Sequence, residues 1–255
     1  MLRTLLICGL IAGLCGGIVA AGVATVAGEP AIDQAIAVED GKAKAAHEEP
    51  APELVPRDVQ KSFGLLTATC IYGIAIGGMF AIAFAYAYGR VGRASPRTTG
   101  LCLAAIAFVV LYLVPFLKYP ATPPAIGDPD TIEKRTLLYV VMICISVLAA
   151  VSAARLRTLL VDRLSGFWAT VVAVAAYVVV VIAAGVALPG IHEVPADFPA
   201  TTLWRFREGS IALQAALWAT LGLVFSVLAQ RVMTGQPILP RRSSSRREVA
   251  APARD

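Results

Sequence analysis

Residues 166–188 read GFWATVVAVAAYVVVVIAAGVAL, an apolar run without one charged side chain. A helix needs about 20 consecutive apolar residues to cross the hydrocarbon core of a bilayer. Because lipid cannot hydrogen-bond to the backbone, a spanning segment of this kind must satisfy its own N–H and C=O groups as an α-helix. The run therefore predicts a transmembrane helix, and it sets the fold class for the rest of the chain.

Five further apolar runs lie on the two sides of this one, and no charged residue falls inside any of them. A charge at the centre of a bilayer costs about 2.5–3.5 kcal/mol on insertion scales, so lipid selects against it. A transmembrane β-barrel would show alternating segments of about ten residues instead. We therefore predict an all-α, polytopic membrane bundle of about six helices. The predicted spans are 5–28, 63–88, 100–117, 137–154, 166–188 and 210–230.

Composition agrees with lipid as the solvent. Hydrophobic residues make up 58% of the chain, charged residues 15%, and the mean hydropathy is +0.74. Soluble domains have about 25% charged residues. The net charge of +5 does not indicate nucleic acid as a partner, because the basic residues are spread over short connections and a tail. The first run is too long for the 7–15-residue core of a signal peptide, so we interpret it as a retained span.

Charge also predicts orientation. With the N-terminus inside, the inside segments carry 13 basic and three acidic residues, and the outside loops carry nine basic and 14 acidic residues. Lys and Arg gather on the cytoplasmic side of membrane proteins, so both termini are predicted in the cytoplasm. Residues 1–233 form the predicted transmembrane domain. Within it, 38–56 is a predicted flexible outside loop, and 234–255 is a predicted disordered basic cytoplasmic tail.

Glycines recur at a spacing of four in the first two runs, at Gly9, Gly13 and Gly17, then at Gly73 and Gly77. Small residues at this spacing let two helix backbones approach closely. Glycine is also common in membrane helices in general. A tight interface between the first two helices and simple enrichment therefore both stay open.

Catalytic and nucleotide-binding signatures are absent. The sequence has no G-x-x-x-x-G-K-[ST], C-x-x-C, H-E-x-x-H or G-x-S-x-G, and it has only two histidines. We predict that the chain is no enzyme and holds no cofactor.

Candidate metal ligands gather in the outside loops. Imidazole suits ions such as cobalt, nickel and zinc, and carboxylates suit harder ions. Such loops are also often only solvated helix ends, and that interpretation stays open. Pro115 and Pro189 are predicted to end their helices at the outer edge, and Glu29 and Asp33 close the first helix. The candidate ligands are Asp128, Asp130, Glu133, His192, Glu193 and Asp197 at the outer face, with Cys15 and Cys144 as a thiolate pair near mid-membrane.

The same loops resemble a known family. Residues 114–132 (VPFLKYPATPPAIGDPDTI), 193–200 (EVPADFPA), 203–207 (LWRFR) and 29–36 (EPAIDQAI) are similar to the CbtA family of predicted cobalt transporter subunits. The resemblance extends to about residue 233. It implies uptake of cobalt across the cytoplasmic (inner) membrane for cobalamin synthesis, and a small, single-span CbtB-type partner with a histidine motif. Many members carry several histidines in the first outside loop, whereas this chain has only His47 there.

The expected function is a membrane permease subunit for a divalent transition metal, Co²⁺ foremost, with the ion as cargo. Two alternatives stay open. A non-transporting scaffold subunit would have the same helices, and a permease for another, neutral solute would suit a membrane interior without ionisable groups. Homo-oligomerisation also stays open.

Overall fold

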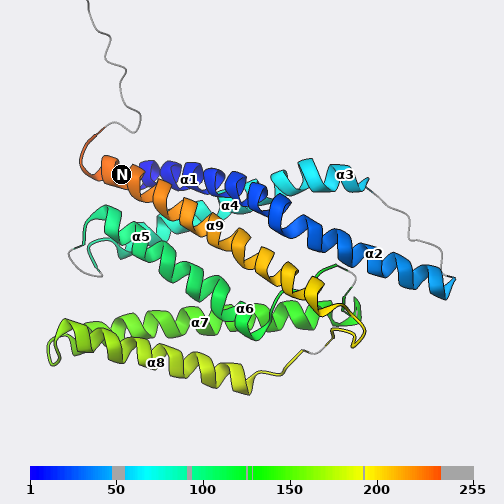
Figure 1. Ribbon diagram of the computed structural model, residues 1–255. Helices are drawn as coiled ribbons and strands as arrows, with labels where there is room; N and C mark the ends of the chain where they lie inside the picture. The colour runs from blue at the N-terminus through cyan, green and yellow to red at the C-terminus, as the bar shows by residue number, and fades with distance from the viewer. Residues whose placement is uncertain (48–54, 91–93, 125, 128, 192, 237–255) are drawn as a thin grey trace, which may run out of the picture.

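The computed structural model describes residues 1–47, 55–90, 94–124, 126–127, 129–191 and 193–236 (Figure 1). Over these residues, six helical segments are long and apolar enough to cross a membrane. The prediction of an all-α bundle of about six transmembrane helices is confirmed.

The first three segments each consist of several helical pieces, and each contains a π-helical turn. The first joins α1 (Leu2–Val23), η1 (Ala24–Gly28) and α2 (Glu29–Ala46). The second joins α3 (Arg57–Val59), η2 (Gln60–Gly64) and α4 (Leu65–Ala87). The third joins α5 (Pro96–Ala107), η3 (Phe108–Leu113) and α6 (Val114–Lys118). After the 3₁₀ turn η4 (Pro129–Thr131) come α7 (Ile132–Leu160), α8 (Gly166–Ala187) and α9 (Ala200–Met233).

The first segment differs most from its prediction, because α2 continues to Ala46. Part of the predicted flexible loop, 38–46, is therefore helical, while 48–54 lies outside the described residues. The sequence explains the extension: alanine is the strongest helix former, and Asp40 and Lys44 are spaced as a favourable i,i+4 pair. The helix stops at His47, which has a left-handed φ of 58°. Figure 1 shows α2 projecting past the end of the bundle.

Close backbone contact joins α1 to α4. A Cβ on Gly13 would collide with the carbonyl oxygen of Gly73, and a Cβ on Gly9 would collide with that of Gly77. A Cβ on Gly17 would lie only 2.5 Å from the carbonyl oxygen of Thr69. Only glycine permits this approach, so the spacing of four marks a tight interface between the first two spans.

Aromatic packing fills the adjoining core between α4 and α9. Phe225 of α9 makes edge-on contacts with Phe80 and Phe84 of α4, each with ring centroids 5.0 Å apart. All three side chains are buried. Edge-to-face pairs contribute about 0.5–1.5 kcal/mol beyond their buried area. The helices α1, α4, α5 and α9 thus form the packed body of the molecule.

The hairpin of α7 and α8 lies against this body through α6 and η3, along the lower edge in Figure 1. Most of α8 is exposed, as expected for a helix that faces lipid. The start of α1, the end of α9 and the turns after α4 and α7 lie at one end of the bundle (Figure 1). The shared end agrees with an even number of crossings. That this end faces the cytoplasm stays a prediction.

Pro115 does not end its helix, contrary to the prediction, because α6 continues to Lys118. In the π-helical register of η3, the N–H of residue 115 would bond to the carbonyl of Val110. Proline has no N–H. The Ser146 hydroxyl, from α7, donates instead to the Val110 oxygen at 2.8 Å. Pro189 follows the last residues of α8, as predicted.

Candidate functional site

A cavity of about 450 Å³ opens where the end of α6, the start of α7 and the start of α9 meet. Its volume lies in the range of small-molecule sites. Tyrosines line it from three directions, with Tyr112 on η3, Tyr119 just after α6 and Tyr139 on α7. The Tyr119 hydroxyl donates to the Pro189 carbonyl at 2.9 Å and thereby links the loop after α6 to the loop after α8. Burial raises the pKa of Tyr119, so its hydroxyl stays protonated and able to donate.

Three basic side chains line this cavity: Lys118, Arg135 and Arg207. Arg135 Nε lies 3.4 Å from Glu193 Oε2. Arg207 Nε donates to the Ala121 carbonyl at 3.3 Å, and the Lys118 ammonium lies 5.6 Å from the centre of the Tyr119 ring. Glu193 is the one acid in the described part of the lining. The cavity is therefore basic over its described residues, which is opposite in sign to the summed charge of the predicted outside loops.

The position of Gly127 explains why Arg135 lies so close to its loop. Gly127 has a φ of +115°, which residues with a side chain rarely adopt. A Cβ at this position would collide with the Arg135 guanidinium. A glycine therefore permits both the turn and the contact.

The predicted outer ligands are spread along the loops. Glu193 lies in the cavity, whereas Asp130, Glu133 and Asp197 are exposed. Asp128 and His192 lie outside the described residues. In the part of the chain that is described, no group of three or more His, Cys, Asp or Glu residues is placed to hold a metal ion. The predicted ligand set therefore stays a prediction.

The two predicted thiol ligands lie on helices that the fold keeps apart. Cys15 is half-buried on α1, and Cys144 is exposed on α7. Figure 1 shows α1 and α7 on opposite sides of the bundle, with α5 and α9 between them. The structure does not bring these cysteines together.

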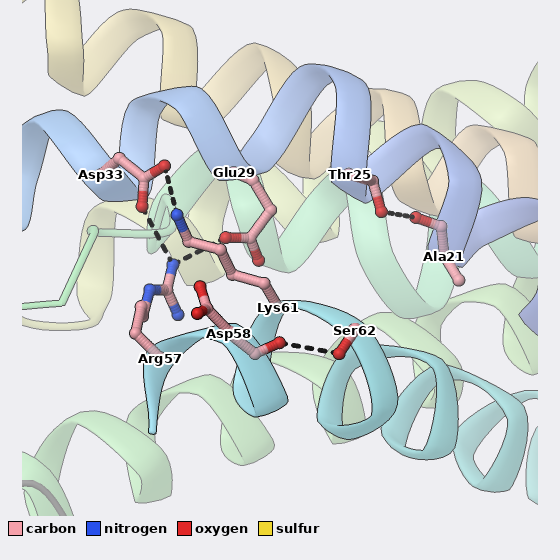
Figure 2. A network of polar contacts seen from close by, with 8 residues as sticks. All are labelled: Ala21, Thr25, Glu29, Asp33, Arg57, Asp58, Lys61 and Ser62. Atoms are coloured by element: carbon pink, nitrogen blue, oxygen red, sulfur yellow. Dashed lines mark hydrogen bonds and ion pairs between the residues drawn. The ribbon is translucent and has the colours of Figure 1, made fainter. Parts of the chain in front are cut away.

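A second polar cluster, the outer clamp, consists of Glu29, Asp33, Arg57 and Lys61 (Figure 2). Arg57 Nη2 donates to Glu29 Oε2 at 2.6 Å and lies 3.6 Å from Asp33 Oδ1. Lys61 Nζ donates to Asp33 Oδ2 at 2.7 Å. The hydrogen bond from Lys61, assisted by the nearby Arg57 charge, lowers the pKa of Asp33. Glu29 and Asp33 do not close the first helix as predicted, because α2 continues past them; they are instead paired with bases at the start of the second long helix.

Hydroxyl groups supply polarity within the membrane. Besides its bond to the Val110 carbonyl, Ser146 shares a hydrogen bond of 2.9 Å with the Tyr177 hydroxyl of α8. Tyr112 and Ser210 share another of 2.9 Å, between η3 and α9. Reasoning from the sequence missed these residues, and it missed the basic lining of the cavity. Pro115 within a span was the one available signal, because it predicts an unpaired carbonyl in the preceding turn.

One protein family, described as "Probable cobalt transporter subunit (CbtA)", matches residues 2–230. No curated protein and no solved structure matches the chain. The match covers all six long helices up to the last residues of α9 and includes both loops that line the cavity. The chain is therefore a multi-pass membrane protein that belongs to the CbtA family of probable cobalt transporter subunits.

Proposed function

We propose that this chain is the permease subunit for uptake of a divalent transition metal ion, Co²⁺ foremost, across the cytoplasmic membrane. The observation that carries the proposal is the CbtA match over residues 2–230, on a chain with six helices able to cross a membrane. Cobalt taken up in this way would support cobalamin synthesis. The chain acts as a transporter subunit rather than an enzyme, and a small, single-span CbtB-type protein is its proposed partner.

Chemistry of the outer face supports capture of a cation outside the basic cavity. Asp130 on η4, Glu133 in the first turn of α7 and Asp197 in the loop before α9 are exposed. Carboxylates attract divalent cations, and nearby imidazole would add preference for transition metals. His192 and Asp128 remain the proposed further ligands.

Passage through the bilayer is the harder step, because the membrane-spanning runs contain no ionisable carboxylate or imidazole. Three oxygen atoms within the bundle are available to coordinate an ion: the hydroxyls of Ser146 and Tyr177 and the carbonyl of Val110. In the proposal they act as transient ligands, and the partner supplies the nitrogen ligands that the membrane-spanning runs of this chain lack.

Uptake of radioactive cobalt by cells tests the proposal, with this chain and a CbtB-type subunit expressed together and singly. We expect saturable uptake from the pair, with loss when Asp128, His192 and Asp197 are all changed to alanine. Competition by nickel and zinc measures the selectivity. Unchanged uptake in the triple variant would refute the proposed ligands, and uptake no greater than in cells without the pair would refute the permease.

A scaffold subunit is the second candidate, and the charge of the outer cavity favours it. Lys118, Arg135 and Arg207 would repel a free divalent cation at short range. A scaffold would raise uptake only by stabilising its partner. Uptake that persists when the partner is overproduced without this chain would therefore favour the scaffold.

A further inference from the structure

We propose that the outer cavity binds an anionic oxygen group, a carboxylate or a phosphate, between Lys118 and Arg207, with Arg135 beside them. All three side chains line the same space of about 450 Å³, and the tyrosine hydroxyls line it as well. Nothing in the cobalt proposal requires this site. It is inferred from the charge and hydrogen bonding of the cavity alone.

Two of the three basic side chains, Arg207 and Lys118, have hydrogen-bond donors that no described residue uses. Arg207 spends one donor, Nε, on the Ala121 carbonyl. Lys118 contacts the face of the Tyr119 ring. Over the residues that the structure describes, no carboxylate forms an ion pair with either of them. Arginine presents five donors in a planar fork that matches carboxylate and phosphate oxygens, so its remaining donors suit an anion.

The described lining of the cavity carries more positive than negative charge. Glu193 is the one acid in the described lining, and it lies within ion-pair distance of Arg135. The lining therefore has two positive charges more than it has negative ones, counted over its described residues. In a partly enclosed space these charges interact more strongly than in water, so an anion stabilises the cavity and a bare cation does not.

The positions of Lys118 and Arg207 along the membrane normal allow the bound anion to come from two sources. Lys118 directly follows the apolar run of the third span, and Arg207 lies just before the apolar run of the sixth. Lys and Arg side chains near the ends of membrane-spanning helices extend to the headgroup level, so both are placed to reach lipid phosphates. The anionic group can thus belong to a lipid headgroup or to a small soluble molecule.

Calorimetric titration of the full chain in nanodiscs of zwitterionic phosphatidylcholine tests the soluble source, with citrate and inorganic phosphate as separate probes. We expect saturable binding that Arg207→Gln weakens about tenfold, since a charge-assisted hydrogen bond is lost. Lys118→Gln should weaken it as well. Arg205→Gln is the matched control, because Arg205 lies on the same helix, is exposed and does not line the cavity.

Native mass spectrometry after reconstitution with phosphatidylglycerol tests the lipid source. Retained anionic lipid that is lost in Arg207→Gln and kept in Arg205→Gln assigns the site to a headgroup phosphate. Equal behaviour of these two variants with every probe, in samples that remain monodisperse with unchanged helical circular dichroism, would overturn the proposal. If Arg207→Gln does not fold, Lys118→Gln decides by the same comparison. Neither measurement involves cobalt, so failure of the permease proposal leaves this one intact, and the reverse also holds.

Discussion

Arg57 and Glu29 join the first two long helices just beyond the apolar runs: the Arg57 guanidinium donates to the Glu29 carboxylate at 2.6 Å (Figure 2). Only 8% of Glu29 is exposed. Their positions place the contact at the point where α2 leaves the bundle and α3 returns to it. A buried carboxylate that loses its partner keeps the full cost of its desolvation, so this contact can be tested by removing one side.

Arg57→Gln should lower the free energy of unfolding by about 2 kcal/mol, the cost of leaving a buried charged group unpaired. Thermal unfolding in detergent, followed by circular dichroism, measures the change. In the double variant Glu29→Gln/Arg57→Gln, part of the loss should be restored, because neither charge then remains buried alone. Asp58→Asn is the control, since the Asp58 side chain is exposed. A loss equal to that of the control would contradict the clamp.

The lowered pKa of Asp33 predicts how the stability of the fold depends on pH. Lys61 and Arg57 lower its pKa in the folded state, so Asp33 stabilises the fold above its unfolded pKa. This contribution is lost as the pH falls through the lower, folded pKa. The melting temperature of the native chain should therefore exceed that of Asp33→Asn at neutral pH, and the two should converge in acid. The Asp33 side chain is 46% exposed, so added salt should also narrow the difference. A gap that is constant with pH would refute this account.

Gly13→Ala tests the contact between α1 and α4. The added Cβ would collide with the Gly73 carbonyl, so one helix must shift. Overpacking in a core costs about 1–3 kcal/mol. Gly22→Ala, on the same helix and facing open space, should cost nothing and should gain slightly in helix propensity. Resistance to unfolding by added SDS compares the two variants. Equal resistance would show that the close approach is unimportant.

Ser146→Ala removes the donor that satisfies the Val110 carbonyl and also the partner of Tyr177. The buried carbonyl would be left unpaired at a cost of about 1–3 kcal/mol. Ser152→Ala, six residues further along α7 and exposed, provides the control. A double-mutant cycle with Tyr177→Phe isolates the shared hydrogen bond. Additive effects in that cycle would show that Ser146 acts through Val110 alone.

Sequence patterns predicted the number of spans because hydropathy reports directly on lipid as the solvent. They also provided the glycine spacing, although only the structure shows that Gly13 and Gly73 meet. The extension of α2 was missed because a polar, alanine-rich segment reads as a loop when apolar residues are the signal.

The basic cavity could not be predicted, because Lys118, Arg135 and Arg207 are far apart in the sequence and adjacent only through packing. Counting charge over the predicted outside loops gave more acidic than basic residues. The fold instead places these bases together and leaves Asp130 and Asp197 outside the cavity. Secondary structure is thus easier to predict from this sequence than the sign of the charge in a cavity formed by distant segments.

The helical run Leu2–Ala45 contains 44 residues, about 66 Å at 1.5 Å per residue. A bilayer with its headgroups is about 40–45 Å thick, so roughly 20 Å of this rod stands clear of the lipid. The outer clamp fixes the start of α2 to the second long helix, so α2 is a rigid projection rather than a flexible linker. A soluble protein or an antibody that approaches the membrane from the side to which α2 projects would contact α2 before it reached the loops around the cavity.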